Sequence, residues 1–129
     1  MSNEAMKKPI VLFVDDEVET LKSVKFGLEE RSYSVLTAES GKDALEILKT
    51  NVPNIMIIDL RMQPMNGFEL YQIIRKNAKF QKVPVFFLTA VDDMLSQKYS
   101  QKLGVDAYIT KPVDLDNLDA LISSKLSSV

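Results

Sequence analysis

Short runs of consecutive apolar residues alternate along the chain with longer stretches whose apolar residues recur every three or four positions. The first run, Ile10–Val14, is entirely apolar, a pattern typical of a strand that is buried on both faces. Similar runs predict four further strands, at Tyr33–Leu36, Ile55–Ile58, Val83–Leu88 and Ala107–Thr110. Strands that alternate with amphipathic helices favour an α/β fold, here a single doubly wound five-stranded parallel sheet with five helices on its two faces.

Amphipathic stretches fill the intervals between these runs, and their apolar residues have helical spacing. In the fourth stretch, for example, the stripe consists of Leu95, Tyr99 and Leu103. Residues that favour caps mark several predicted helix ends, with Ser40, Asn66 and Asp114 at helix starts and Gly104 at a helix end.

The length and composition predict one soluble domain. The chain has 129 residues, of which 46% are hydrophobic and 26% charged, and it contains no cysteine. A net charge of −2 gives no electrostatic reason to expect direct contact with nucleic acid or a membrane surface. The apolar runs are far shorter than the ~20 residues that span a bilayer, so we expect a cytoplasmic protein.

We expect residues 9–126 to form the domain. Residues 1–8 are polar and are expected to be disordered or introduced by cloning. Residues 127–129 are expected to be a tail or the start of a linker, because the chain becomes rich in serine there.

Polar residues gather where the predicted strands end. Asp15 and Asp16 follow the first strand, Asp59 follows the third, Thr89 follows the fourth, and the fifth runs into Lys111. Ligands of open parallel sheets bind beyond the carboxyl ends of the strands. With the flavodoxin-like strand order 2-1-3-4-5, which is borrowed from that fold, the first and third strands are neighbours and these side chains share one rim.

The chemistry of this rim suits a metal ion and a phosphoryl group. Clustered carboxylates repel one another and are relieved by a cation, and oxygen ligands suit Mg²⁺. The hydroxyl of Thr89 and the ammonium group of Lys111 can receive a doubly negative group beside that ion. A carboxylate is a known phosphoryl nucleophile, so Asp59 is a candidate phosphoacceptor.

The same residues carry a resemblance to a known family. The pair Asp15–Asp16, the stretch from Asp59 to Met62 with Gly67, the pair Thr89–Ala90 and the pair Lys111–Pro112 resemble the motifs of response-regulator receiver domains, of the kind seen in chemotaxis regulators. The resemblance covers nearly the whole chain. Each motif is weak alone, but all occur in order, each at a strand end.

The resemblance implies a role for each residue. Asp59 would accept a phosphoryl group from a sensor histidine kinase or a phosphotransfer protein, with Thr89 and Lys111 binding the phosphoryl oxygens. Mg²⁺ would be held by Asp15, Asp16, Asp59 and the backbone carbonyl of Arg61.

The resemblance further implies a cis peptide bond before Pro112 and a switch formed by Thr89 and Tyr108. The switch would reshape the fourth helix, fifth strand and fifth helix, where an output domain or effector protein would bind, and the protein would be a monomer or a phosphorylation-dependent dimer. Such a domain is not an enzyme in the usual sense, because it catalyses only its own phosphorylation and dephosphorylation.

One departure and two alternatives remain open. Family members often have proline four residues after the phosphoacceptor, where this chain has Gln63, with Pro64 one place later; an altered loop conformation is expected. The chain could be a degenerate receiver that acts as a docking module without phosphorylation. The other alternative is an aspartyl-nucleophile phosphatase, although the second acid that such enzymes use close to the nucleophile is missing. With no histidine in the chain, a histidine-based triad or zinc site is excluded.

Overall fold

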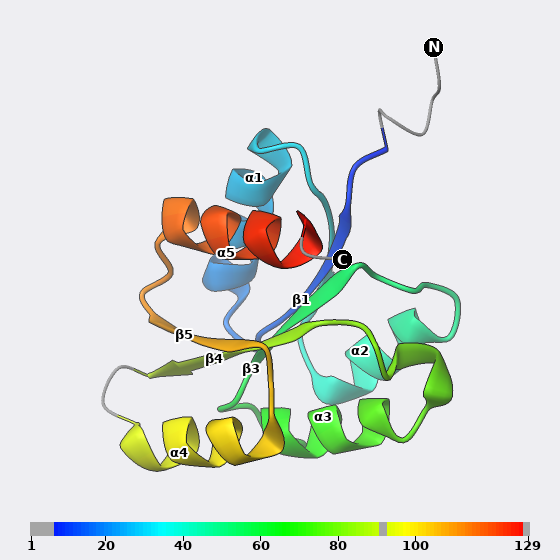
Figure 1. Cartoon of the computed structure of the whole chain (residues 1–129), viewed down its shortest axis with the longest axis vertical. Helices are drawn as coiled ribbons and strands as arrows, with labels where there is room; N and C mark the ends of the chain where they lie inside the picture. Colours follow the sequence, from blue (N-terminus) through cyan, green and yellow to red (C-terminus); the bar gives the residue numbers. More distant parts are fainter. Residues whose placement is uncertain (1–6, 91–92, 128–129) are drawn as a thin grey trace.

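The computed structural model describes residues 7–90 and 93–127, so parts of the predicted N-terminal segment and tail lie outside the described residues. One parallel sheet has the strand order β2-β1-β3-β4-β5, which confirms the predicted α/β architecture. Figure 1 shows α1 and α5 on one face of this sheet and α2, α3 and α4 on the other. The elements, in chain order, are β1 (Ile10–Val14), α1 (Val18–Glu30), β2 (Ser34–Ala38), α2 (Gly41–Leu48), β3 (Ile55–Asp59), α3 (Gly67–Arg75), the 3₁₀ helix η2 (Ala78–Phe80), β4 (Val85–Ala90), α4 (Met94–Leu103), β5 (Ala107–Lys111) and α5 (Leu115–Ser127).

The central strand β3 shows why the apolar runs are uninterrupted. All five of its residues are buried, because neighbouring side chains point to opposite faces of the sheet and both faces are covered. Met56 and Ile58 belong to the apolar core on the side of α2 and α3. Ile55 and Ile57 belong to the core on the side of α1 and α5.

Helix caps fix where the loops at the carboxyl rim end. The side chain of Asn66 accepts a hydrogen bond from the N–H of Glu69, and the Glu69 carboxylate accepts one from the N–H of Asn66. This reciprocal cap starts α3. Gly67 follows directly, and a Cβ there would overlap the backbone carbonyl oxygen of Asp59. The loop after β3 can therefore fold back on the strand end only because residue 67 is glycine.

Two strands begin later than their apolar runs predict. Tyr33 still belongs to the turn that closes α1, because its N–H donates to the carbonyl of Leu28 after Ser32 adopts a positive φ of 72°, so β2 begins at Ser34. In the fourth run, Pro84 has no N–H to donate to a neighbouring strand. The β4 ladder accordingly begins at Val85.

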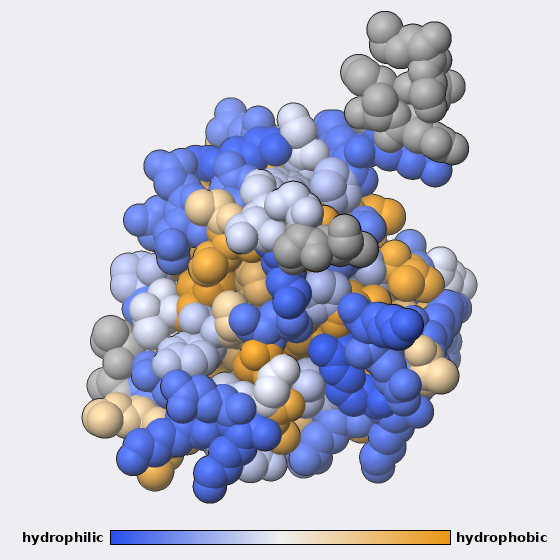
Figure 2. Space-filling model, viewed as in Figure 1, coloured by the Kyte–Doolittle hydropathy of each residue, from blue (hydrophilic) through white to orange (hydrophobic). Residues whose placement is uncertain are grey.

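Helix α4 differs most from its predicted arrangement. Of its apolar stripe, Leu95 is 82% exposed and Tyr99 is 42% exposed. The helix instead turns Ser100 inward, where its hydroxyl donates to the carbonyl of Ser96 at 2.7 Å. Figure 2 shows the resulting apolar atoms at the surface near the start of α4.

Among the described residues, none of the helices combines the length and apolar character that crossing a membrane requires.

Candidate functional site

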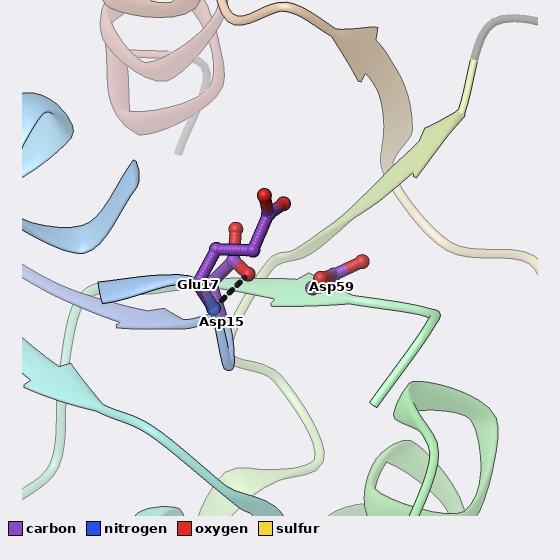
Figure 3. Close-up of side chains that lie close together, drawn as sticks. All are labelled: Asp15, Glu17 and Asp59. Carbon is purple, nitrogen blue, oxygen red and sulfur yellow. Dashed lines mark hydrogen bonds between the residues drawn. The ribbon is translucent and has the colours of Figure 1, made fainter. Parts of the chain in front are cut away.

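The carboxyl rim of the sheet brings the predicted polar residues together. Asp15 follows β1, Asp59 ends β3, Thr89 lies near the end of β4, and Lys111 ends β5. Because the strands are parallel and β1, β3, β4 and β5 are consecutive neighbours, their ends lie at the same edge. Figure 3 shows Asp15 and Asp59 extending from adjacent strands at this edge, with Glu17 beside them.

Asp59 is a buried carboxylate with two defined hydrogen-bond donors. Its residue is 3% exposed. Oδ1 accepts a hydrogen bond from the backbone N–H of Arg61 at 3.1 Å, and Oδ2 accepts one from the Lys111 ammonium group at 3.3 Å. These two contacts fix the orientation of a carboxylate that is almost wholly buried.

Lys111 is the cationic centre of the site. Its Nζ lies 3.2 Å from Asp15 Oδ2 and 3.3 Å from Asp59 Oδ2, and it also pairs with Glu17. Burial opposes the charged form of the lysine, but the hydrogen bond to Glu17 and the charges of Asp59 and Asp15 outweigh it and raise the pKa of Lys111. The ammonium group therefore remains charged at neutral pH.

The carboxylates of Asp15 and Asp59 are close enough to repel each other. Burial and, after it, the neighbouring Asp15 raise the pKa of Asp59, the Arg61 N–H and Lys111 act in the opposite direction, and the net result is a pKa of about 7. A single ammonium group thus compensates the buried pair incompletely. The site favours an additional positive charge.

The donor set fits a hard divalent cation. Carboxylate oxygens of Asp15, Glu17 and Asp59 lie within 4.8 Å of one another. Asp15 Oδ2 is buried and has no aligned hydrogen-bond donor among the described residues, although the Lys111 ammonium lies 3.2 Å away. A buried oxygen with unused acceptor capacity, beside two further carboxylates, has the chemistry that Mg²⁺ prefers.

The predicted ligand set is only partly assembled. Asp15 and Asp59 lie together, and the backbone of Arg61 is attached to Asp59. Asp16 is exposed and is not part of the carboxylate cluster; it lines a surface hollow with Arg61 instead. The structure brings Glu17 to the cluster, a residue that the sequence reasoning missed. The signal available for it was its place as the third consecutive acidic residue after β1.

Thr89 and Tyr108 lie on the neighbouring strands β4 and β5, two positions apart in the ladder, where Thr89 pairs with Thr110 and Tyr108 pairs with Phe87. Thr89 is buried, and its hydroxyl donates to the carbonyl of Ala90 at 3.4 Å. Tyr108 is half-buried against the core below α3 and α4, and its hydroxyl accepts a hydrogen bond from Gln101 at 3.3 Å. The Thr89 hydroxyl thus has one long internal contact, which a stronger acceptor at the rim can replace.

The proline positions noted in the sequence both follow cis peptide bonds. These are the bonds between Lys111 and Pro112 and between Gln63 and Pro64.

Comparison with known proteins gives a consistent family. The sequence model for the response regulator receiver domain matches residues 11–123. The transcriptional regulatory protein CrdR of Helicobacter pylori is 39% identical over 117 residues, which are 91% of this chain and 54% of CrdR. Protein PilH of Pseudomonas aeruginosa is 29% identical over 91% of this chain and 97% of its own length. The chain spans about half the length of the first curated relatives that it matches.

Solved structures give the same result. The receiver domain of the Francisella response regulator 1452 superposes with a TM-score of 0.84 and 30% identity, covering 94% of this chain and 98% of that one. A CheY-like response regulator receiver domain protein from Methanospirillum hungatei superposes with a TM-score of 0.85 and 28% identity over 94% and 95% of the two chains. From the sequence match and the shared architecture, this chain belongs to the response regulator receiver domain family.

Proposed function

We propose that this domain is a phosphorylation-activated signalling switch in which Asp59 accepts a phosphoryl group from the phosphohistidine of a sensor kinase or phosphotransfer protein. The observation that carries the proposal is the position of Lys111, whose Nζ lies within 3.3 Å of both buried aspartates. This arrangement offers an oriented carboxylate nucleophile beside a fixed positive charge. Phosphoryl transfer needs little more from a protein than such positioning and charge neutralisation.

The proposed transfer is a direct displacement. An Asp59 oxygen forms a bond to phosphorus as the bond from phosphorus to the donor imidazole nitrogen breaks, and the electron pair of that bond returns to the imidazole. Lys111 stays with the phosphoryl oxygens, and the Thr89 hydroxyl exchanges its long contact with Ala90 for a phosphoryl oxygen.

Mg²⁺ completes this proposal. Asp15 and Asp59 would hold it, with Asp16 and the backbone carbonyl of Arg61 as further ligands. The ion would supply the positive charge that offsets the carboxylates and the incoming phosphoryl oxygens. The buried Asp15 Oδ2, which accepts no hydrogen bond from the described residues, supports a bound Mg²⁺ at this site.

The output would follow from Thr89. Its movement toward a phosphoryl group would free space beside Tyr108, whose ring packs at the edge of the core, and would alter the surface of α4, β5 and α5. We propose that this surface binds an output domain or effector. The protein itself would be a monomer or a phosphorylation-dependent dimer. Relatives named as transcriptional regulators are about twice the length of this chain, which supports an output domain as partner.

Intact-mass measurement tests the proposal. The chain is incubated with acetyl phosphate and Mg²⁺, and Asp59→Asn is treated in parallel. One added phosphoryl mass in the wild type, lost without Mg²⁺ and absent from the variant, is expected. No added mass under any condition would overturn phosphoacceptor function and favour a phosphorylation-independent docking module; rapid turnover of a generic phosphate ester would favour a phosphatase instead.

A further inference from the structure

Arg61 connects two loops of the rim. Its backbone N–H donates to Asp59 Oδ1 at 3.1 Å, so its main chain is attached to the phosphoacceptor side chain. In its side chain, Nε lies 3.6 Å from Asp93 Oδ2. One residue therefore contacts both the end of β3 and the start of α4.

The two carboxylate oxygens of Asp93 have different partners. Oδ1 accepts a hydrogen bond from the N–H of Ser96 at 3.1 Å and caps α4, while Oδ2 faces Arg61. The N–H of Asp93 donates to the carbonyl of Ala90, the residue after Thr89. The Asp93 side chain is only 15% exposed, whereas that of Arg61 is 66% exposed, so Asp93 is the fixed partner and Arg61 is the one with room to move.

Among the described residues, the first turn of α4 buries little apolar surface. Met94 and Leu95 are 67% and 82% exposed, so apolar burial contributes little at this end of the helix. Polar contacts to Asp93 are therefore a large share of what fixes the position of this turn. Exposed ion pairs are individually weak, so the contact between Arg61 and Asp93 can be replaced by a stronger one.

We propose that Arg61 is a positioning residue that clasps the first turn of α4 to the phosphoacceptor loop through Asp93, and that a phosphoryl group on Asp59 draws its guanidinium away. The second part rests on the proposed function. The Arg61 backbone already lies against Asp59, so the new negative charge arises within reach of its side chain. A guanidinium group binds phosphoryl oxygens through paired, charge-assisted hydrogen bonds, which are stronger than a 3.6 Å contact to a carboxylate.

Hydrogen exchange in the unphosphorylated full chain tests the clasp. Arg61→Gln removes the positive charge, and Asp93→Asn removes the negative charge but keeps the oxygen that caps Ser96. We expect each variant to speed amide exchange in the first turn of α4 by about two- to fivefold, as suits an exposed ion pair. The double variant should be no faster than either single one, and Arg61→Lys should remain close to the wild type.

The phosphorylated protein tests the release. Phosphorylation should speed exchange in this turn of the wild type to the level of Arg61→Gln and should have little further effect in that variant. Arg31→Gln, which breaks an ion pair between the C-terminal end of α1 and α5, is the matched control and should leave α4 unchanged.

Two results would overturn the proposal: additive effects of Arg61→Gln and Asp93→Asn, or an undiminished response to phosphorylation in Arg61→Gln. If no phosphoryl mass appeared on Asp59, the proposed function and the release step would both fail. The unphosphorylated comparison would still decide the clasp.

Discussion

Helices α5 and α4 flank the same strand, β5, but are held to the protein in different ways. α5 is fastened by polar contacts from the turn before β2: the Tyr33 hydroxyl donates to Asp119 at 2.7 Å, and Arg31 donates to Asp116 at 2.9 Å. Its first residue, Leu115, packs so closely on α1 that a Cβ on Gly27 would overlap it. In α4, by contrast, the largest apolar side chains of the first turn face solvent.

This contrast teaches which part of the proposed output surface can move. Moving α5 would break hydrogen bonds to partly buried groups and expose the close contact with α1, at a cost of several interactions at once. Moving the start of α4 would exchange a few polar contacts and uncover little apolar area. A signal from Asp59 is therefore expected to move the start of α4 more than it moves α5.

The largest expected difference between α5 and α4 is the loss of stability when an apolar side chain of each helix is shortened. Leu118→Ala in α5 removes a side chain that is 1% exposed, and should lower the free energy of unfolding by about 2–5 kcal/mol. Leu95→Ala in α4 should change it by less than about 0.5 kcal/mol, because the side chain already faces water. Urea denaturation of the two variants measures both values, and similar losses would show that apolar packing holds the start of α4 as firmly as it holds α5.

A second prediction concerns the charge cluster between these two regions. The folded-state pKa of Asp59, about 7, lies above its ordinary value of 3.8. The metal-free protein therefore binds this proton more tightly when folded, so its contribution to stability is full below about pH 4 and is lost as the pH rises through 7. Asp59→Asn removes the buried charge, and should raise the free energy of unfolding at pH 8 by about 1–3 kcal/mol.

The pH dependence distinguishes this effect from a general gain in stability. The difference between Asp59→Asn and the wild type should shrink toward pH 4, and Mg²⁺ should narrow it at pH 8 by stabilising the wild type. Asp43→Asn replaces an exposed carboxylate in α2 and serves as the control. A gain that did not vary with pH would show that charge repulsion at Asp59 is not its source.

What the sequence could predict follows from how each feature is encoded. A strand such as β3, buried on both faces, leaves an uninterrupted apolar run, and the residues that follow parallel strands must meet at one rim. The orientation of α4 could not be predicted, because Leu95 and Tyr99 have the spacing of a buried stripe whether or not their side chains pack against the sheet. The positions of Asp16 and Glu17 depend on the directions of two neighbouring side chains, which consecutive acidic residues do not specify.

A third prediction breaks the fastening of α5. Tyr33→Phe removes the hydroxyl that contacts Asp119 and Ser123, and should lower the free energy of unfolding by about 1 kcal/mol. Amide exchange in the second half of α5 should speed up with it. Tyr99→Phe on α4 is the matched control, with an expected change below about 0.5 kcal/mol; equal effects of the two variants would show that the contacts of Tyr33 do not fasten α5.

The last prediction concerns Thr89, whose substitution should change stability least and tests how the phosphoacceptor is coupled to the output surface. Thr89→Val keeps the shape of a buried side chain and removes a hydroxyl whose internal hydrogen bond is 3.4 Å long, so the free energy of unfolding should change by less than about 1 kcal/mol. If Thr89 transmits the signal to Tyr108, phosphorylated Thr89→Val should show amide exchange around Tyr108 as slow as in the unphosphorylated protein, once its phosphoryl mass has been verified. The first turn of α4 should still respond in this variant, because its contact runs through Arg61. Thr110→Val, at the paired but exposed position on β5, should retain the full response. A normal response around Tyr108 in Thr89→Val would mean that phosphorylation reaches β5 without Thr89.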